Sequence, residues 1–133
     1  MKSDEQILAE LKQATEGLYV MSESDYPFAV IRWKGNIDLS PQYLRELHGA
    51  PEGAPVTVEV FHDMSGFSLF ASPNEGHAWP IGESHDQRLT RVLLENLNDV
   101  RIYKLGAVNI PVYVVGRSLS GDWLGLMTRV VET

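Results

Sequence analysis

The feature that most constrains the fold is the last third of the chain, where three predicted strands follow one another closely. Residues 100–105, 110–116 and 123–131 are rich in β-branched and aromatic side chains, which are typical of strands. The segment 117–122 contains a Ser-Gly-Asp turn, which is typical of a hairpin. Connections this short join antiparallel strands, because a parallel crossover needs a dozen or more residues. The sequence therefore predicts a largely antiparallel sheet.

Three helices are predicted from apolar spacing and from end signals. Apolar residues recur every three or four positions from Ile7 to Leu18, which predicts an amphipathic helix over 4–18. Residues 40–48 begin with Ser-Pro, a favoured N-cap and first position, and predict a short helix. Residues 84–98 open with a capping-box pair and place apolar residues on one face, which predicts the strongest helix.

Two further strands are predicted between these helices. Residues 27–34 and 55–62 are rich in β-formers, and the second alternates valine with other residues. Residues 63–82 show no clear period, and within them 67–71 are expected to form a short helical turn. The order of elements indicates one α+β domain, with helices packed on the sheet.

Composition bounds the class of protein. With 133 residues and 44% hydrophobic content, the chain suits one folded domain. It has no cysteine, which excludes disulfides, thiol catalysis and cysteine-ligated zinc. No apolar run reaches the length of a membrane span or a signal peptide, so we expect a cytoplasmic protein without a membrane partner. The net charge of -7 disfavours direct nucleic-acid binding and favours a basic partner.

No catalytic motif is recognisable. Neither a nucleophile elbow nor a phosphate-binding loop is present, and the four histidines lack metal-ligand spacing, so we expect neither a cofactor nor an enzyme. Glu23 and Asp25 form the one candidate acid/base pair, but no apolar pocket is visible that would separate their pKa values. A metal site assembled from His62, His77 and His85 would require an irregular loop to bring them together.

The stretch 21–27, Met-Ser-Glu-Ser-Asp-Tyr-Pro, places two carboxylates and two hydroxyls between the first predicted helix and the first predicted strand. From the residues alone, two interpretations stay open. It is either a solvated connector or the part of the molecule that contacts a partner.

Two segments resemble the nuclease A inhibitor family. Residues 5–35 share a helix ending in Gly-Leu, the stretch Met-Ser-Glu-Ser-acid-Tyr-Pro-Phe and a strand ending in Trp-Lys-Gly. Residues 103–133 share Tyr-Lys-Leu-Gly, a Gly-containing hairpin and a terminal Val-Val-Glu-Thr. Residues 36–83 match weakly.

The resemblance implies a single domain over 1–133, a helix–sheet–helix sandwich with a mixed, largely antiparallel sheet. It implies a bacterial protein without catalytic activity or cofactor. Its partner would be a sugar-nonspecific DNA/RNA endonuclease of the ββα-metal type, bound one to one and inhibited.

The resemblance also implies which residues block the nuclease. The carboxylate of Glu23 would reach the magnesium of the nuclease, a metal contact that exists only in the complex. The terminal carboxylate of Thr133, beside Glu132, would approach the same site. We expect both to reach one edge of the sheet if strand 123–131 lies near the strand that follows the acidic stretch.

Neighbouring residues of the stretch have expected supporting roles. Ser22 and Ser24 would hold it through hydroxyl-to-backbone hydrogen bonds. Tyr26 is an amphipathic aromatic suited to anchor the partner. Asp25 stands where the family pattern has glutamate.

Two alternatives stay open. The divergence over 36–83 allows the same fold to serve as a non-catalytic interaction module with a different partner. The other alternative is a small hydrolase using Glu23, Asp25 and His62, for which no motif argues.

Overall fold

The computed structural model describes residues 3–16, 18–20, 26–37, 39–51, 53–64, 69–71, 85–106 and 109–131. The elements, in chain order, are α1 (Asp4–Thr15), β1 (Leu18–Val20), β2 (Tyr26–Pro27), β3 (Ala29–Trp33), α2 (Pro41–Leu47), β4 (Val56–Val60), β5 (Leu69–Ala71), α3 (His85–Asn96), β6 (Asn98–Leu105), β7 (Asn109–Arg117) and β8 (Trp123–Val131).

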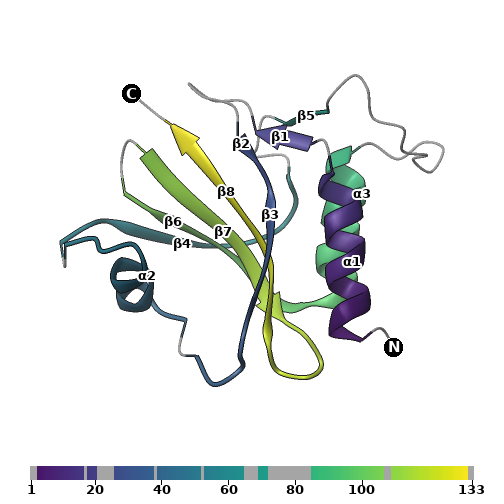
Figure 1. Ribbon diagram of the computed structural model, residues 1–133, viewed down its shortest axis with the longest axis horizontal. Helices are drawn as coiled ribbons and strands as arrows, with labels where there is room; N and C mark the ends of the chain where they lie inside the picture. The colour runs from purple at the N-terminus through teal and green to yellow at the C-terminus, as the bar shows by residue number, and fades with distance from the viewer. Residues whose placement is uncertain are drawn as a thin grey trace.

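The main sheet has five strands in the order β3-β8-β7-β6-β4, and each of its described pairings is antiparallel (Figure 1). The predicted meander of the last three strands is confirmed. The β7–β8 hairpin closes where the Ser118 N–H donates to the Asp122 carbonyl at 3.0 Å. Gly121 has a φ of 93° in this turn, a conformation that glycine adopts without the steric cost of a Cβ.

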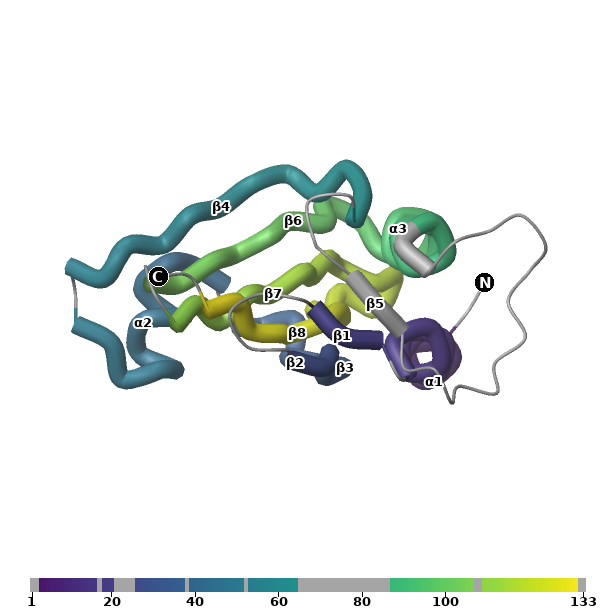
Figure 2. Tube along the Cα trace, turned by 90° about the horizontal axis from the view of Figure 1, so that it is seen from above, coloured from purple at the N-terminus to yellow at the C-terminus, as the bar shows by residue number. Residues whose placement is uncertain are grey.

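Helices cover both faces of this sheet (Figures 1 and 2). α1 and α3 pack on one face, where Leu11 and Leu93 belong to the larger apolar core. α2 packs on the other face through Leu44, against Tyr113 and Val115 of β7. β7 is buried from residue 110 to 116 because it lies in the middle of the sheet between the two helical layers. The predicted α+β helix–sheet–helix sandwich is confirmed.

The start of α2 is as predicted. The Ser40 side chain accepts a hydrogen bond from the Tyr43 N–H at 3.2 Å, and Pro41 occupies the first helical turn. The predicted capping box of α3 depends on Ser84, which lies outside the described residues.

Two local predictions were wrong. The first helix ends at Thr15, not at residue 18, because Glu16 has extended backbone angles and the Thr15 hydroxyl donates back to the Leu11 carbonyl at 2.8 Å. Leu18 then begins a strand. Residues 69–71 form strand β5 and no helical turn, because they pair with β1. Strands β2, β1 and β5 make a second, three-stranded sheet.

The contact between α2 and the sheet predicts a pH-dependent stability. His48 caps α2, and its Nε2 lies 2.7 Å from the Tyr113 hydroxyl. Burial, and secondarily the positive charge of Arg129, lower the pKa of His48. The folded protein therefore binds this proton less readily than the unfolded chain. We expect the contribution of His48 to the free energy of unfolding to be fully present above about pH 6.5, the ordinary histidine pKa. This contribution is lost as the pH falls from there through the pKa of folded His48.

Urea unfolding at several pH values between 5 and 8 measures this dependence. His48→Gln is expected to flatten it over that window, whereas His62→Gln, at an exposed position, is the control. An identical slope in wild type and His48→Gln would contradict the prediction.

Candidate interface at the first hairpin and the last strand

The acidic stretch connects two paired strands. β1 and β2 are antiparallel, with Val20 opposite Tyr26, so residues 21–25 join the two arms of a hairpin. The sequence predicted a connector from helix to strand, because the predicted helix extended to Leu18, the first residue of β1, and no strand was predicted over residues 18–20. A hairpin fixes both ends of the segment within one strand spacing.

Neighbouring elements hold the base of this hairpin. β5 pairs with β1 on the side away from β2, with Tyr19 opposite Phe70. Leu18 and Val20 are buried, and Leu18 joins the core beneath α1 and α3. The hairpin is therefore anchored by the hydrophobic core as well as by strand pairing.

The last strand ends beside the hairpin. β3 pairs with β8, with Ala29 opposite Met127. The buried Thr128 hydroxyl donates to the Pro27 carbonyl at 3.0 Å, which ties β8 to the hairpin's second arm. Figure 1 draws the end of β8 and the β1–β2 hairpin at the same end of the sheet. The expectation that strand 123–131 lies next to the strand following the acidic stretch is confirmed.

The predicted contact residues fall largely in segments next to these elements. Tyr26 is half-buried in β2. The remaining ones lie outside the described residues, and their roles stay predictions; they are Ser22, Glu23, Ser24, Asp25, Glu132 and Thr133.

A hollow of about 460 Å³ adjoins the hairpin, and sequence reasoning missed it. It lies between the end of α1, strand β1 and the chain entering β3. Its lining residues are Lys12, Thr15, Glu16, Tyr19, Pro27, Phe28, Ala29 and Val30. They come from three segments, so no single stretch of sequence carries a signal for it.

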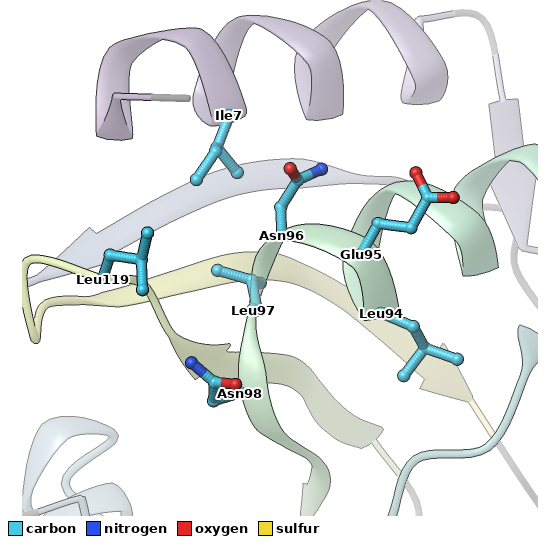
Figure 3. A pocket seen from close by; sticks show the side chains of 7 residues that line it. All are labelled: Ile7, Leu94, Glu95, Asn96, Leu97, Asn98 and Leu119. Carbon is cyan, nitrogen blue, oxygen red and sulfur yellow. The ribbon is translucent and has the colours of Figure 1, made fainter. Parts of the chain in front are cut away.

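A second hollow, of about 440 Å³, lies at the far end of α3 and is lined by seven residues from three parts of the chain (Figure 3). Among the described residues that line it, Glu95 is the one ionisable side chain, and it forms an ion pair with Arg91 at 3.8 Å. The Asn96 amide donates to the Val92 carbonyl at 2.8 Å. The described lining of this hollow therefore does not supply the convergent acid and base that a hydrolase needs.

The acidic residues near the start of α1 have a structural role. Arg32 lies 2.9 Å from Asp122, 3.4 Å from Asp4 and 3.4 Å from Glu5. The hydrogen bond from Arg32, and then that from the Gly35 N–H, lower the pKa of Asp122. These contacts tie α1 to β3 and to the β7–β8 hairpin, at the end of β3 away from the acidic stretch.

The hydrolase alternative receives no support from the described residues. His62 is exposed just after β4, at the edge of the sheet opposite β3. Within the described ranges, no three histidine, aspartate or glutamate side chains are grouped so that they could hold a metal ion. Glu23, Asp25 and His77 lie outside those ranges, as does the side chain of His85.

A comparison with protein families now adds to this geometry. The model of the family described as nuclease A inhibitor-like protein matches residues 5–133. The chain belongs to the nuclease A inhibitor-like family. The match runs through residues 36–83, where the shared sequence motifs are weak. No curated protein gives a significant match to the chain.

Membership in the nuclease A inhibitor-like family identifies the general class of activity. The family description implies a nuclease inhibitor whose partner is a nuclease A-like endonuclease. The expectation that the chain is not an enzyme is confirmed by this family match. Within the described parts of the chain, no helix has the length and apolar character needed to cross a membrane.

Proposed function

We propose that this protein inhibits a sugar-nonspecific DNA/RNA endonuclease by covering its magnesium site. The contacts are made by residues 21–25 and by residues 132–133, and one inhibitor binds one nuclease. The carboxylate of Glu23 makes the decisive contact with the nuclease. The inhibitor binds the nuclease in the cytoplasm.

One observation carries this proposal. The Thr128–Pro27 hydrogen bond and the β3–β8 register bring the base of the acidic hairpin and the end of β8 together. Residue 132 follows Val131 directly, and residue 25 precedes Tyr26 directly. Tyr26 and Val131, the described residues that adjoin the two acidic segments, belong to elements that this hydrogen bond and the β3–β8 pairing hold together, which supports a single partner site that meets both segments.

The chemistry of such a nuclease suits a carboxylate. Magnesium prefers hard oxygen ligands and keeps positions for water and for a substrate phosphate oxygen. A carboxylate from Glu23 supplies an anionic oxygen in place of the phosphate, and it offers no phosphodiester bond to cleave. Because the hairpin is anchored at its base, its docking costs less conformational entropy than docking of a free loop.

The surroundings supply further contacts. The net charge of -7 steers the protein toward the basic groove of a nucleic-acid-cleaving enzyme. Tyr26 of the second hairpin arm offers an aromatic anchor, and the 460 Å³ hollow, which Pro27 of the same arm helps to line, offers a concave surface. Such contacts add affinity without touching the metal.

A titration tests the proposal. Cleavage of plasmid DNA by a ββα-metal nonspecific nuclease, with magnesium, is measured against increasing amounts of this protein. We expect activity to fall linearly to zero at one inhibitor per nuclease. Absence of inhibition, together with capture of a partner that is not a nuclease, would instead favour the alternative of an interaction module with another partner.

Removal of Thr133 tests the contribution of the second segment. We expect the inhibition constant to rise by about tenfold, because one charged contact to the partner is worth roughly 1–3 kcal/mol. Thr133→Ala is the matched control and should stay near wild type, since it keeps the chain length. If the two variants inhibit equally, residue 133 does not contribute through its main-chain carboxylate.

A further inference from the structure

Strand β4 forms one edge of the main sheet, opposite β3. Among the described strands it pairs with β6 on one side and with none on the other, and Figure 2 shows it along the outer side of the molecule. Val58 is 40% exposed and Val60 is 59% exposed. An exposed edge of this kind is a template for pairing with another strand.

Two hydrogen bonds at the ends of β4 show which of its residues turn their backbone N–H and C=O groups toward β6. The Gly106 N–H donates to the Pro55 carbonyl at 2.8 Å, and the Phe61 N–H donates to the Val100 carbonyl at 3.0 Å. Hydrogen-bonding residues alternate along an antiparallel strand, so Thr57 and Glu59 also face β6. The N–H and C=O groups of the three valines in between therefore point outward; these are Val56, Val58 and Val60.

We infer that a second copy of this chain pairs with β4, antiparallel and around a twofold axis at Val58. Val58 then lies opposite Val58 of the second copy, and Val56 lies opposite Val60. Each of these pairs exchanges two hydrogen bonds. The two five-stranded sheets become one continuous sheet across the dimer.

The charges favour this register and this occupant. Thr57 lies opposite Lys104 of β6. In the dimer, Glu59 of the second copy lies opposite Thr57 on its other side. The carboxylate of that Glu59 and the ammonium of Lys104 then lie on the same face of the sheet, with the small Thr57 side chain between them. A register centred on Glu59 would oppose two carboxylates directly. One centred on Thr57 would leave Val60 opposite Ala54, beyond the end of β4.

The position of β4 keeps the candidate interface accessible. β4 and β3 are at opposite edges of the sheet, and the acidic hairpin adjoins β3. The dimer therefore leaves the β1–β2 hairpin of each copy free to bind a partner. The inference of a dimer does not depend on the proposed function.

Cysteine cross-linking tests the register directly, because the chain has no native cysteine. In Val58→Cys, the two Cα atoms lie about 5.5 Å apart, within disulfide range. In Val60→Cys, they lie roughly 14 Å apart, since four residues separate them along the strand. We expect oxidation to link Val58→Cys into a dimer and to leave Val60→Cys monomeric, although residue 60 is the more exposed. Equal linking of both variants, or linking of neither, would overturn the inference.

Light scattering on the unmodified protein gives an independent test. We expect wild type to reach twice the monomer mass of 14.9 kDa as concentration rises through the micromolar range. Val58→Lys should stay monomeric, because two ammonium groups meet at the axis, whereas Val58→Thr should still dimerise. Far-UV circular dichroism checks that the variants are folded. Leu119→Lys, at a residue 67% exposed in the β7–β8 hairpin, is the control and should leave the dimer intact. A monomeric wild type at every concentration, or a dimer lost in Leu119→Lys, would overturn the inference.

Discussion

Replacing Glu23 with alanine is expected to weaken nuclease inhibition by at least about 2 kcal/mol, or roughly 30-fold in the inhibition constant. The reason is that the carboxylate is the group proposed to occupy the place of a phosphate oxygen near the magnesium of the partner. Its removal takes away a charge contact at the centre of the interface, where truncations cost most. The measurement is the inhibition constant from plasmid cleavage at several inhibitor concentrations.

Two variants make this result specific. Glu23→Gln keeps the shape and a neutral oxygen, and we expect it to lose most of the same affinity because the negative charge is gone. Glu46→Ala changes the net charge by the same amount at an exposed position on α2, and it should inhibit as wild type does. Thermal unfolding of all three should agree closely, since surface substitutions usually change stability by less than about 0.5 kcal/mol. Undiminished inhibition by Glu23→Ala would remove the proposed magnesium contact and leave the family membership unaffected.

The largest effect on stability is expected for Gly125→Ala, in the second strand from the β3 edge. A Cβ at this position would overlap the backbone oxygen of Val114 and lie 2.8 Å from the Cα of Val115. Both atoms belong to β7, which is packed between helices on both faces and cannot move aside. We expect the free energy of unfolding to fall by at least about 3 kcal/mol, the upper range for overpacking. A domain stable by roughly 5–15 kcal/mol then loses a large part of its margin.

Urea unfolding followed by circular dichroism measures this loss. Gly53→Ala is the matched control, because a Cβ there meets no atom within 4 Å. The control should unfold at the wild-type midpoint or slightly above it, since alanine lowers the entropy of the unfolded chain. A Gly125→Ala midpoint equal to that of Gly53→Ala would show that β7 and β8 can separate locally without cost.

The sequence by itself determined the elements whose signals are local and long. The β-branched and aromatic runs of β7 and β8, the turn at Gly121 and the Ser40-Pro41 start of α2 all appear as predicted. These features rest on β propensity, positive φ and helix capping, which act over a few neighbouring residues. The acidic stretch was found from its resemblance to the family, since its composition alone also fits a solvated turn.

Only the tertiary structure decided how that stretch is held. β1 has three residues, too few for a period to show, and its partner β5 lies far along the chain. The hollow beside the hairpin is lined by three separate segments within residues 12–30, and the Thr128–Pro27 bond joins segments that are distant in sequence. The valines of β4 predict a strand, but only the sheet order shows that this strand is at an edge and that their backbone groups point outward. In each case the deciding energy is pairing or burial between separate segments of the chain, which no local pattern of amino acids records.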